Sequence, residues 1–301
     1  MYFVTEREVY ENFDMPLAIN AMKEAFEEYY KGNAGSNSRA RTFAGESVLS
    51  TMPAFMDKYH IAGFKSYIAS RSGAKFVVLL FDTSASELLA IVEANRLGQV
   101  RTGAVPAVAT SILHGKCSVF ALIGSGFQAE TQLEGILKVS DPEEIRVYSR
   151  TFSHRKAFAE RMSKMFEREI KYYDDLKTTL DGADVISCIT SSGEPIITDL
   201  SFNEAYHLNL AGSNMPSRRE ASGNVIAASD LVVVEHLEQA LIESSEISEF
   251  VKGGGKAVEL KEVVGSGASF NGHKRTLFKS MGIGLEDISS AYHVLKRMKL
   301  I

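Results

Sequence analysis

Residues 117–137, CSVFALIGSGFQAETQLEGIL, join an apolar strand, a glycine turn and a helix without interruption. Gly124, Gly126 and Ala129 complete the pattern G-x-G-x-x-A at the junction. The first glycine permits a tight turn, the second lets a pyrophosphate approach the backbone, and the helix N-terminus offers free N–H groups to its charge. The pattern alone also fits an ordinary strand-to-helix turn. Its flanking strand and helix predict a dinucleotide-binding fold.

The residues after Lys116 repeat this alternation of strand and helix. Short apolar runs typical of strands are separated by turns and by stretches with helical spacing. Such an alternation predicts a parallel sheet covered by helices on both faces, as in the Rossmann fold. We expect strands at 117–123, 144–149, 169–173, 184–190, 206–212 and 231–235, and helices at 127–139, 152–168 and 217–228.

The residues before Lys116 follow a different pattern. A helix is expected between Asp14 and Gly32, and four β-rich runs between residues 47 and 93 predict a mostly antiparallel sheet. Residues 33–46 are rich in Gly, Ser, Asn and Arg and have no periodicity, which predicts a loop.

A further helix is expected to begin near Thr102 and to end at His114, with Pro106 in its first turn. The change of pattern after this helix predicts two domains. The first is an α+β domain over 1–115, completed by a C-terminal helix within 280–301, and the second is a Rossmann domain over 116–279. The expected fold class is therefore α/β with an additional N-terminal α+β domain.

Composition and charge exclude several kinds of partner. The 301 residues include 33 Lys and Arg against 38 Asp and Glu, a net charge of −5, which argues against nucleic acid or an anionic membrane and favours small-molecule ligands. The longest apolar run, residues 76–81, is far shorter than the ~20 residues of a membrane helix, and the acidic N-terminus does not resemble a signal peptide. We therefore expect a soluble, cytoplasmic protein.

Neither a disulfide nor a metal site is expected. Cys117 and Cys188 lie far apart, and the seven histidines have no metal-ligand spacing. Cys188 is expected to be a small core residue.

The second strand of the expected Rossmann domain ends in Ser149-Arg150-Thr151. A carboxylate that would bind the ribose 2′-hydroxyl of NAD is absent there. Hydroxyls and a guanidinium suit the 2′-phosphate of NADP, which a carboxylate would repel. NADP(H) is therefore the preferred cofactor. The alternative is that Arg150 is a solvated surface charge and that NAD(H) binds.

Seven segments spread over nearly the whole chain share their order and spacing with one protein family. They are RTFAGESVLSTMPAF (41–55), IAGFK (61–65), LGQVRTGA (97–104), IGSGFQAETQLE (123–134), CITSSGEP (188–195), NLAGSNMPSRREA (209–221) and GLEDISSA (284–291). Together they resemble the ornithine cyclodeaminase/mu-crystallin family. The resemblance implies a homodimer joined through the N-terminal domain, a domain that binds NAD(H) or NADP(H), and a cleft between the domains for a small amino, imino or keto acid.

The resemblance also implies which residues bind the substrate. Arg41 falls at the family position that binds the substrate carboxylate, a task suited to a planar guanidinium, and Arg39 is the alternative. Lys65 matches the active-site lysine, which could protonate a substrate nitrogen if its pKa is lowered. Arg101 and Thr102 would open the expected helix and reach the substrate carboxylate and the cofactor phosphates, helped by helix N-terminal N–H groups.

Further positions are expected to contact the cofactor. Thr190 ends an expected strand at the carboxyl edge of the sheet, where ligands of such folds bind. The complete set of expected cofactor-binding residues is Thr102, Gly124, Ser125, Gly126, Phe127, Gln128, Ser149, Arg150, Thr151, Thr190 and Ser213.

One departure from the family narrows the chemistry. Cyclodeaminating members carry an aspartate where this chain has Asn214. Asparagine can orient a substrate amine but cannot take its proton, so a cyclodeaminase is disfavoured. The resemblance then implies an NAD(P)H-dependent oxidoreductase that acts on a C=N or C–N bond beside a carboxylate, as ketimine and pyrroline-2-carboxylate reductases do, with Lys65 and Asn214 as catalytic residues. The alternatives are an alanine dehydrogenase, an ornithine cyclodeaminase, or a protein that binds NADPH and a small ligand without turnover.

Overall fold

The computed structural model describes residues 1–266, 270 and 272–301. Contacts within the chain divide it into two compact units. Unit 1 comprises Met1–Ala104 and Gly282–Ile301, and unit 2 comprises Val105–Met281. The division falls within helix α3 (Asn95–Leu113), whereas the sequence places the boundary near residue 116, after the end of that helix.

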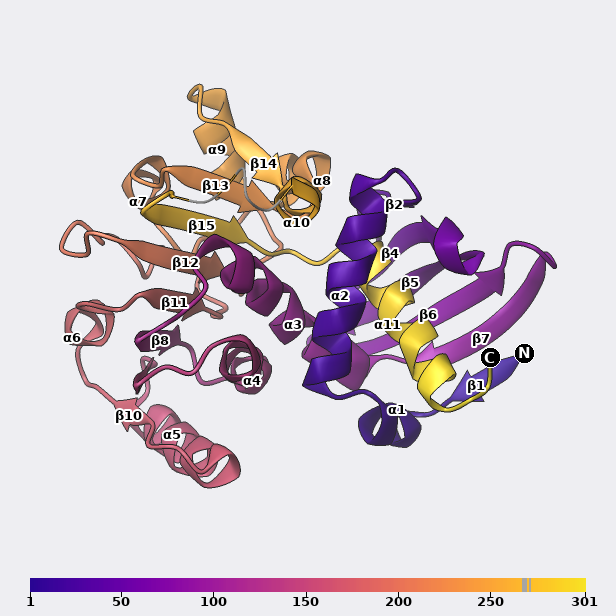
Figure 1. Ribbon diagram of the computed structural model, residues 1–301, viewed down its shortest axis with the longest axis horizontal. Helices are drawn as coiled ribbons and strands as arrows, with labels where there is room; N and C mark the ends of the chain where they lie inside the picture. The colour runs from indigo at the N-terminus through magenta and orange to yellow at the C-terminus, as the bar shows by residue number, and fades with distance from the viewer. Residues whose placement is uncertain (267–269, 271) are drawn as a thin grey trace. The chain divides into compact units, whose positions relative to one another are not determined.

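Unit 1 is built on a sheet with strand order β1-β7-β6-β5-β4-β2, and β3 pairs with β4. All neighbours are antiparallel except β1 and β7, which confirms the expected mostly antiparallel sheet. Helix α11 lies along the sheet with α2 beside it (Figure 1). The elements are β1 (Tyr2–Val4), α1 (Glu6–Asn12), α2 (Met15–Tyr30), β2 (Ala34–Ser36), β3 (Ala40–Ala44), β4 (Ser47–Met56), η1 (Asp57–Tyr59), β5 (Ile61–Ser70), β6 (Gly73–Asp82), β7 (Glu87–Glu93) and α11 (Gly284–Arg297).

The loop expected over residues 33–46 is wrong in part. Strands β2 and β3 lie within it, and both pair with β4, so that Arg41 stands opposite Ser50. The polar composition hid these strands because they have no apolar alternation of their own. They extend the sheet by hydrogen bonding to a long neighbouring strand, which is a tertiary effect.

The start of helix α3 also differs from the expectation. The helix begins at Asn95 instead of near Thr102, and Pro106 therefore lies in its interior, where it removes one helical hydrogen bond. Its first backbone N–H groups, at Asn95 and Arg96, donate to the carboxylate of Glu6 in α1. A carboxylate at a helix N-terminus satisfies exposed N–H groups and offsets the helix dipole. Because Glu6 is distant in sequence, no local pattern revealed this cap.

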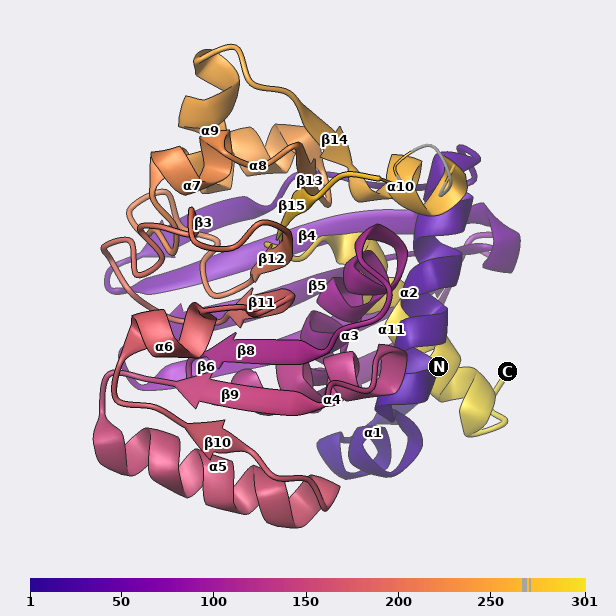
Figure 2. The same ribbon diagram turned by 60° about the vertical axis from the view of Figure 1, so that its left-hand side comes forward.

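Unit 2 is an eight-stranded, fully parallel sheet with strand order β10-β9-β8-β11-β12-β15-β13-β14. The row of strands from β10 to β12, with α5 beside β10, is seen in Figure 2. This confirms the expected Rossmann-type α/β fold. The elements are β8 (Val119–Ile123), α4 (Ala129–Val139), β9 (Glu144–Tyr148), α5 (Phe152–Phe166), β10 (Lys171–Tyr172), α6 (Leu176–Leu180), β11 (Val185–Cys188), β12 (Tyr206–Leu210), α7 (Gly223–Ala227), β13 (Leu231–Val234), α8 (Leu237–Glu243), α9 (Ser245–Lys252), β14 (Ala257–Glu259), α10 (Leu260–Ser266) and β15 (Arg275–Lys279).

The order of the strands defines where ligands bind in such a sheet. From β8 the chain moves outward to β9 and β10, and it then crosses back to β11 on the other side of β8. In open parallel sheets the ligand crevice lies at the carboxyl ends of the strands at this reversal. The glycine turn that contains Gly124 follows β8, and Thr190 follows β11, so both predicted cofactor contacts lie at that edge.

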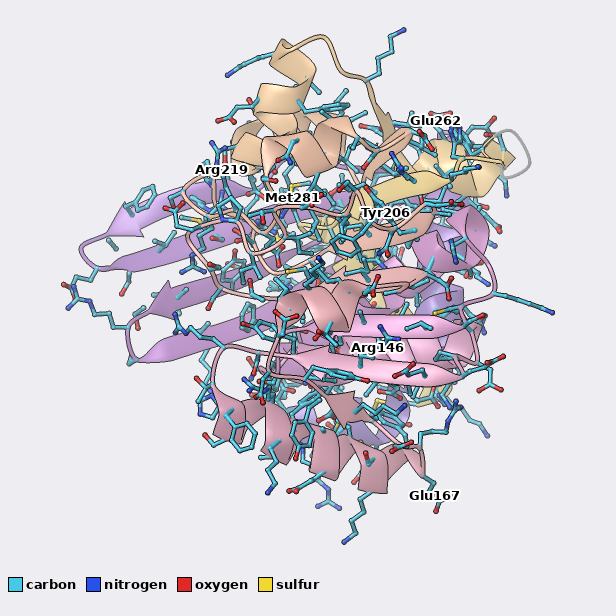
Figure 3. The ribbon with its side chains drawn as sticks, turned by 90° about the vertical axis from the view of Figure 1, so that its left-hand side faces the viewer. Arg146, Glu167, Tyr206, Arg219, Glu262 and Met281 are labelled. Carbon is cyan, nitrogen blue, oxygen red and sulfur yellow. The ribbon has the colours of Figure 1, made fainter. Side chains whose placement is uncertain are left out.

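The side chains of Figure 3 show how this sheet is covered. Arg146 lies on β9, where its guanidinium donates to the carbonyl of Asp181, and Tyr206 begins the buried strand β12. Glu167 ends α5 in a left-handed conformation at the outside of the unit. The central strand β12 is therefore buried along its whole length, whereas β9 also carries partly exposed polar side chains.

The helix expected over residues 217–228 is shorter than predicted. Only Gly223–Ala227 is helical, because the backbone of Glu220 is occupied otherwise. Its carbonyl accepts from the N–H groups of Ile196 and Ile197, and its own N–H donates to Glu246. Helices α8, α9 and α10 and strands β14 and β15 were not predicted from the sequence.

A chain of buried polar groups links α3 to the sheet of unit 2. His207 on β12 contacts the hydroxyl of Thr276 through Nδ1 (2.8 Å) and the side-chain oxygen of Asn209 through Nε2 (3.0 Å). The amide of Asn209 donates to the hydroxyl of Thr110 (3.0 Å), which donates to the carbonyl of Pro106. The side-chain oxygen of Asn209 accepts from Nε2 of His207, and in the neutral imidazole, the state that burial favours, Nδ1 accepts from the hydroxyl of Thr276.

In the part of the chain that the structure describes, no helix has both the length and the apolar character needed to cross a membrane.

The pH dependence of stability tests the neutral state of His207. Burial, followed by the charge of His114, lowers the pKa of His207 to about 3. Between about pH 6.5 and pH 3 the unfolded imidazole is protonated and the folded one is not, so stability falls as pH falls, by up to about 1.4 kcal/mol per pH unit. Chemical denaturation of the wild type and of His207→Gln should therefore show a smaller loss in the variant between pH 6.5 and pH 4.5. Equal slopes would contradict a neutral buried His207.

Candidate functional site

Lys65 lies on β5 of unit 1 and is buried, with 4% of its surface exposed. Its Nζ lies 3.0 Å from Oδ1 of Asp287, which is fully buried in the first turn of α11. The rings of Phe76 and Tyr67 also lie near the amine, at 5.2 and 5.9 Å from Nζ to the ring centroids. A buried charge needs a partner, and here a carboxylate and two aromatic rings provide it.

Arg101 joins the same carboxylate from α3. Its Nε lies 3.0 Å from Oδ1 of Asp287, and its Nη1 lies 2.7 Å from Oε2 of Glu286. Gly282 has a positive φ of 76°, and a Cβ at this position would lie 2.4 Å from Nη1 of Arg101. The guanidinium therefore packs directly on the backbone of Gly282, and no side chain fits there.

Arg39 belongs to the same region of unit 1. It is buried, and its Nη2 donates to the carbonyl of Gly282 at 3.1 Å. With Lys65 and Arg101 it forms the cationic cluster, a group of three cations against the two carboxylates of Glu286 and Asp287. The cluster carries one positive charge in excess when all five groups are ionised. Such an excess in a buried region favours binding of an anion.

The charges of the cluster shift the ionisation of Lys65. Burial lowers the pKa of the amine most, Arg101 and, less, Arg39 also lower it, and Asp287 raises it, which together bring the pKa to about 8. An amine with a pKa in this range can give up a proton near neutral pH. Lys65 therefore has the ionisation that a proton donor needs.

Arg41 and Thr102 differ from the expectation. Arg41 is only half-buried on β3, whereas Arg39, the alternative for carboxylate binding, is the arginine beside the cluster. Thr102 lies two turns into α3, and its hydroxyl donates to the carbonyl of Gly98 at 2.7 Å. The expected contribution of helix N-terminal N–H groups at Arg101 and Thr102 is therefore wrong, because the helix begins at Asn95, whereas the binding roles of the two side chains stay predictions.

The glycine turn of unit 2 has the geometry that its sequence predicts. Gly124 has a positive φ of 122°, and a Cβ there would lie 2.4 Å from the carbonyl oxygen of Ile189. At Gly126 the space around the Cβ position is open. Gly124 thus packs against the neighbouring strand, and Gly126 leaves room for a ligand above helix α4. These two features fit the pyrophosphate of a dinucleotide.

Side chains next to the turn supply polar groups. The hydroxyl of Ser125 donates to that of Ser149 at 2.9 Å, which joins the turn to the end of β9. Phe127 is exposed, and Gln128, at the start of α4, has a buried side-chain oxygen without a hydrogen-bond partner among residues 1–266, 270 and 272–301. These groups fit the bound dinucleotide, whose site they would line.

Arg150 and Thr151 follow β9 and are both exposed, as a residue that receives a phosphate must be. Arg155, one turn along α5, is buried and donates to the carbonyl of Ser149 at 2.8 Å and to Asp174. Arg155 therefore braces the turn, and Arg150 is the guanidinium exposed beside Ser149 and Thr151.

Thr190 and Ser213 follow β11 and β12, the next strands beyond β8. The carboxylate of Glu220 accepts hydrogen bonds from the N–H groups of Thr190 (3.0 Å) and Gly212 (2.8 Å), which ties these two strand ends together. Ser213 is buried and Asn214 is half-buried beside it. Cys188 is buried at the end of β11, where burial raises the pKa of its thiol, so it is a core residue.

Sequence reasoning missed the carboxylates of both units. Glu286 and Asp287 in unit 1, and Glu220, Glu235 and Glu246 in unit 2, are all buried. The segments GLEDISSA and NLAGSNMPSRREA contain three of them, and carboxylates inside otherwise apolar or small stretches were the available signal. No group of three or more residues suited to a metal ion occurs in the described part of the chain.

Two reductases are similar to this chain in sequence. A Δ1-pyrroline-2-carboxylate reductase of Bacillus cereus is 32% identical over 229 residues, which cover 73% of this chain and 70% of that protein. The ketimine reductase mu-crystallin of Mus musculus is 31% identical over 215 residues, 71% of this chain and 66% of the mouse protein, just under two thirds.

A solved structure extends the likeness to the whole chain. The Δ1-pyrroline-2-carboxylate reductase of Thermococcus litoralis, in complex with NADH and L-proline, is 26% identical, has a TM-score of 0.90, and the match covers 100% of this chain and 98% of that one. The model of the ornithine cyclodeaminase/mu-crystallin family matches residues 1–300. The chain therefore belongs to the ornithine cyclodeaminase/mu-crystallin family.

Proposed function

We propose that the protein is an NAD(P)H-dependent reductase of the C=N bond in a small imino acid, such as a ketimine or pyrroline-2-carboxylate. Family membership and the activities named for the relatives support this reaction class. The observation that carries the proposal is the buried cationic cluster of Lys65, Arg101 and Arg39 on Asp287. It combines a positive excess, suited to a substrate carboxylate, with an amine of lowered pKa.

The residues of unit 1 would bind and protonate the substrate. Arg101 offers a guanidinium to the carboxylate, and Arg39 or Arg41 provides a second one, since planar donors suit bidentate binding. Lys65, as an ammonium paired with Asp287, donates a proton to the substrate nitrogen and becomes a neutral amine. Reduction of a C=N bond requires this proton together with the hydride that the nicotinamide dinucleotide supplies when bound.

Residues of unit 2 would hold the cofactor and orient the substrate. Gly126 leaves room for the pyrophosphate beside the tight turn at Gly124, and Asn214, which follows β12, would orient the substrate nitrogen with its amide. Ser149, Arg150 and Thr151, which follow β9 without an acidic residue among them, offer hydroxyls and a guanidinium to a 2′-phosphate. This supports NADP(H) over NAD(H).

An assay of the purified protein tests the proposal. Reduced cofactor is followed by absorbance with pyrroline-2-carboxylate, piperideine-2-carboxylate, or pyruvate plus ammonia as substrate. We expect a cyclic imino acid with NADPH to give the highest kcat/KM, and Lys65→Met to lose at least about 100-fold in kcat while it still binds NADPH, because a general acid is removed.

The other outcomes assign the protein differently. Preference for NADH would refute the role of Ser149, Arg150 and Thr151. Oxidation of alanine with NAD, without reduction of cyclic imino acids, would identify an alanine dehydrogenase. Release of ammonia from ornithine would identify a cyclodeaminase, and tight NADPH binding without turnover would identify a binding protein.

We further propose that the protein is a homodimer joined through the sheet of unit 1. Four large apolar side chains of β4, β5 and β6 are exposed on one face of this sheet, although alternation would favour polar residues on a solvated face. Leu49 and Ile68 stand directly opposite each other in the register of β4 and β5. The exposed set is Leu49, Phe55, Ile68 and Phe81. Contiguous exposed apolar side chains are typical of a protein–protein interface.

Light scattering after gel filtration tests the dimer. The chain has a mass of 33.0 kDa, so a dimer should give about 66 kDa. Leu49→Lys combined with Ile68→Lys should shift the mass toward that of the monomer, because two unpaired positive charges would have to be buried at the interface. Exchange of exposed Lys164, on α5 of unit 2, for Glu is the control, which should keep the dimer mass. A wild-type mass near that of one chain would contradict the proposal.

A further inference from the structure

Two strand ends of unit 2 are joined by a single carboxylate. Oε1 of Glu220 accepts from the N–H of Thr190 at 3.0 Å, and Oε2 accepts from the N–H of Gly212 at 2.8 Å. Thr190 follows β11 and Gly212 follows β12. Glu220 itself is fully buried and comes from the segment before α7, so it bridges two loops to which it does not belong.

The backbone of Gly212 packs closely against Thr190 and the carboxylate of Glu220. A Cβ at position 212 would lie 2.2 Å from the N and O atoms of Thr190 and 2.4 Å from Oε1 of Glu220. The carbonyl of Ile189 in turn lies against Gly124, in the turn after β8. The loops after β8, β11 and β12 are therefore in mutual contact, and Glu220 sets the spacing of the last two.

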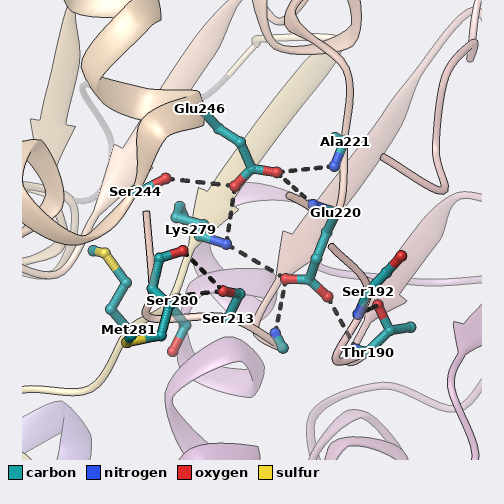
Figure 4. A network of polar contacts seen from close by, with 12 residues as sticks. Thr190, Ser192, Ser213, Glu220, Ala221, Ser244, Glu246, Lys279, Ser280 and Met281 are labelled. Carbon is teal, nitrogen blue, oxygen red and sulfur yellow. Dashed lines mark hydrogen bonds and ion pairs between the residues drawn. The ribbon is translucent and has the colours of Figure 1, made fainter. Parts of the chain in front are cut away.

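Lys279 and Glu246 lie next to Glu220 in the same polar network (Figure 4). Nζ of Lys279, at the end of β15, lies 3.4 Å from Oε2 of Glu220 and 3.1 Å from Oε2 of Glu246. Oε1 of Glu246 accepts from the N–H groups of Glu220 (2.6 Å) and Ala221 (2.9 Å). Burial lowers the pKa of Lys279, but the two carboxylates more than offset this, so its pKa lies above the usual value and it stays charged.

The order of the strands determines which part of a dinucleotide meets these loops. The pyrophosphate site is the glycine turn after β8, and the residues suited to the adenosine ribose follow β9. Since β11 and β12 lie on the opposite side of β8 from β9, the other half of the cofactor must extend toward Thr190 and Ser213. That half carries the nicotinamide.

From this juxtaposition we propose that Glu220 is a positioning residue for the nicotinamide half of the cofactor. This proposal rests on the proposed function, since it assumes that the protein binds a nicotinamide dinucleotide. By fixing the amides of Thr190 and Gly212, Glu220 sets the distance between the loops that carry Thr190 and the Ser213–Asn214 pair. Without it the glycine turn and the end of β9 keep their own contacts, so the adenosine half of the site is preserved.

Binding of two ligands to Glu220→Gln tests the proposal. The glutamine keeps the shape of the side chain but turns an N–H donor toward one of the two backbone N–H groups, which loses a charge-assisted hydrogen bond. We expect the Kd of NADPH, measured by its fluorescence, to rise by about tenfold or more. The Kd of 2′-phosphoadenosine diphosphoribose, which lacks the nicotinamide, should change by less than about twofold, measured by calorimetry.

Two further variants separate positioning from folding. Glu246→Gln is the matched control, because Glu246 shares Lys279 with Glu220 but does not touch Thr190 or Gly212. It should lower the melting temperature and leave the ratio of the two Kd values unchanged. Glu220→Asp keeps the charge beside Lys279, but its side chain is too short to reach both amides. It should therefore raise the Kd of NADPH relative to that of 2′-phosphoadenosine diphosphoribose, as Glu220→Gln does. Glu220→Asp replaces Glu220→Gln in the test if the latter variant does not fold.

The proposal would be overturned if the Kd values of the two ligands changed by the same factor. Equal weakening of both ligands in Glu220→Gln and Glu220→Asp, or a Glu246→Gln variant with the same altered ratio, would reduce Glu220 to a structural core residue. Because only binding is measured, a wild type that fails to reduce imino acids would defeat the proposed function and leave this test intact.

Discussion

The carboxylate of Asp287 is the interaction on which the candidate substrate site depends. A buried lysine and a buried arginine cannot stay charged without a partner, and removal of one partner from such a pair costs about 3–5 kcal/mol. Asp287 serves both Lys65 and Arg101 through one oxygen, and Glu286 takes a second nitrogen of Arg101. Because both acids lie in the first turn of α11, the C-terminal segment completes a site whose cations come from β5 and α3.

Unit 2 also contains buried ion pairs between a cation and carboxylates. Glu220 and Glu246 together accept from four backbone N–H groups, and Lys279 forms an ion pair with each of the two carboxylates. In unit 1 three buried cations face two carboxylates, so one positive charge is in excess. In the functions proposed for them, the buried ion pairs of unit 1 would prepare an anion site and those of unit 2 would set the spacing of two loops.

The sequence revealed the elements whose information is local. The glycine turn at Gly124 and the alternation of β4 to β7 were predictable because turn geometry and periodicity are properties of a short stretch. The start of α3 was not, because its cap is Glu6, and β3 was not, because its partner strand defines it. Lys65 could be selected by resemblance, but its partner Asp287 lies 222 residues away in sequence, and pairing over such a distance is visible only in three dimensions.

The central claim is that Asp287 holds Lys65 in the protonated state from which it gives its proton to the substrate. The most direct test is the pH dependence of kcat/KM for imino acid reduction in the wild type and in Asp287→Asn. With a pKa of about 8 for Lys65, wild-type activity should fall as pH rises through 8. Removal of the negative charge leaves burial and Arg101 unopposed, so the variant should lose activity at a lower pH. If the pH at which kcat/KM falls on the alkaline side were unchanged or higher in Asp287→Asn, this result would contradict the account.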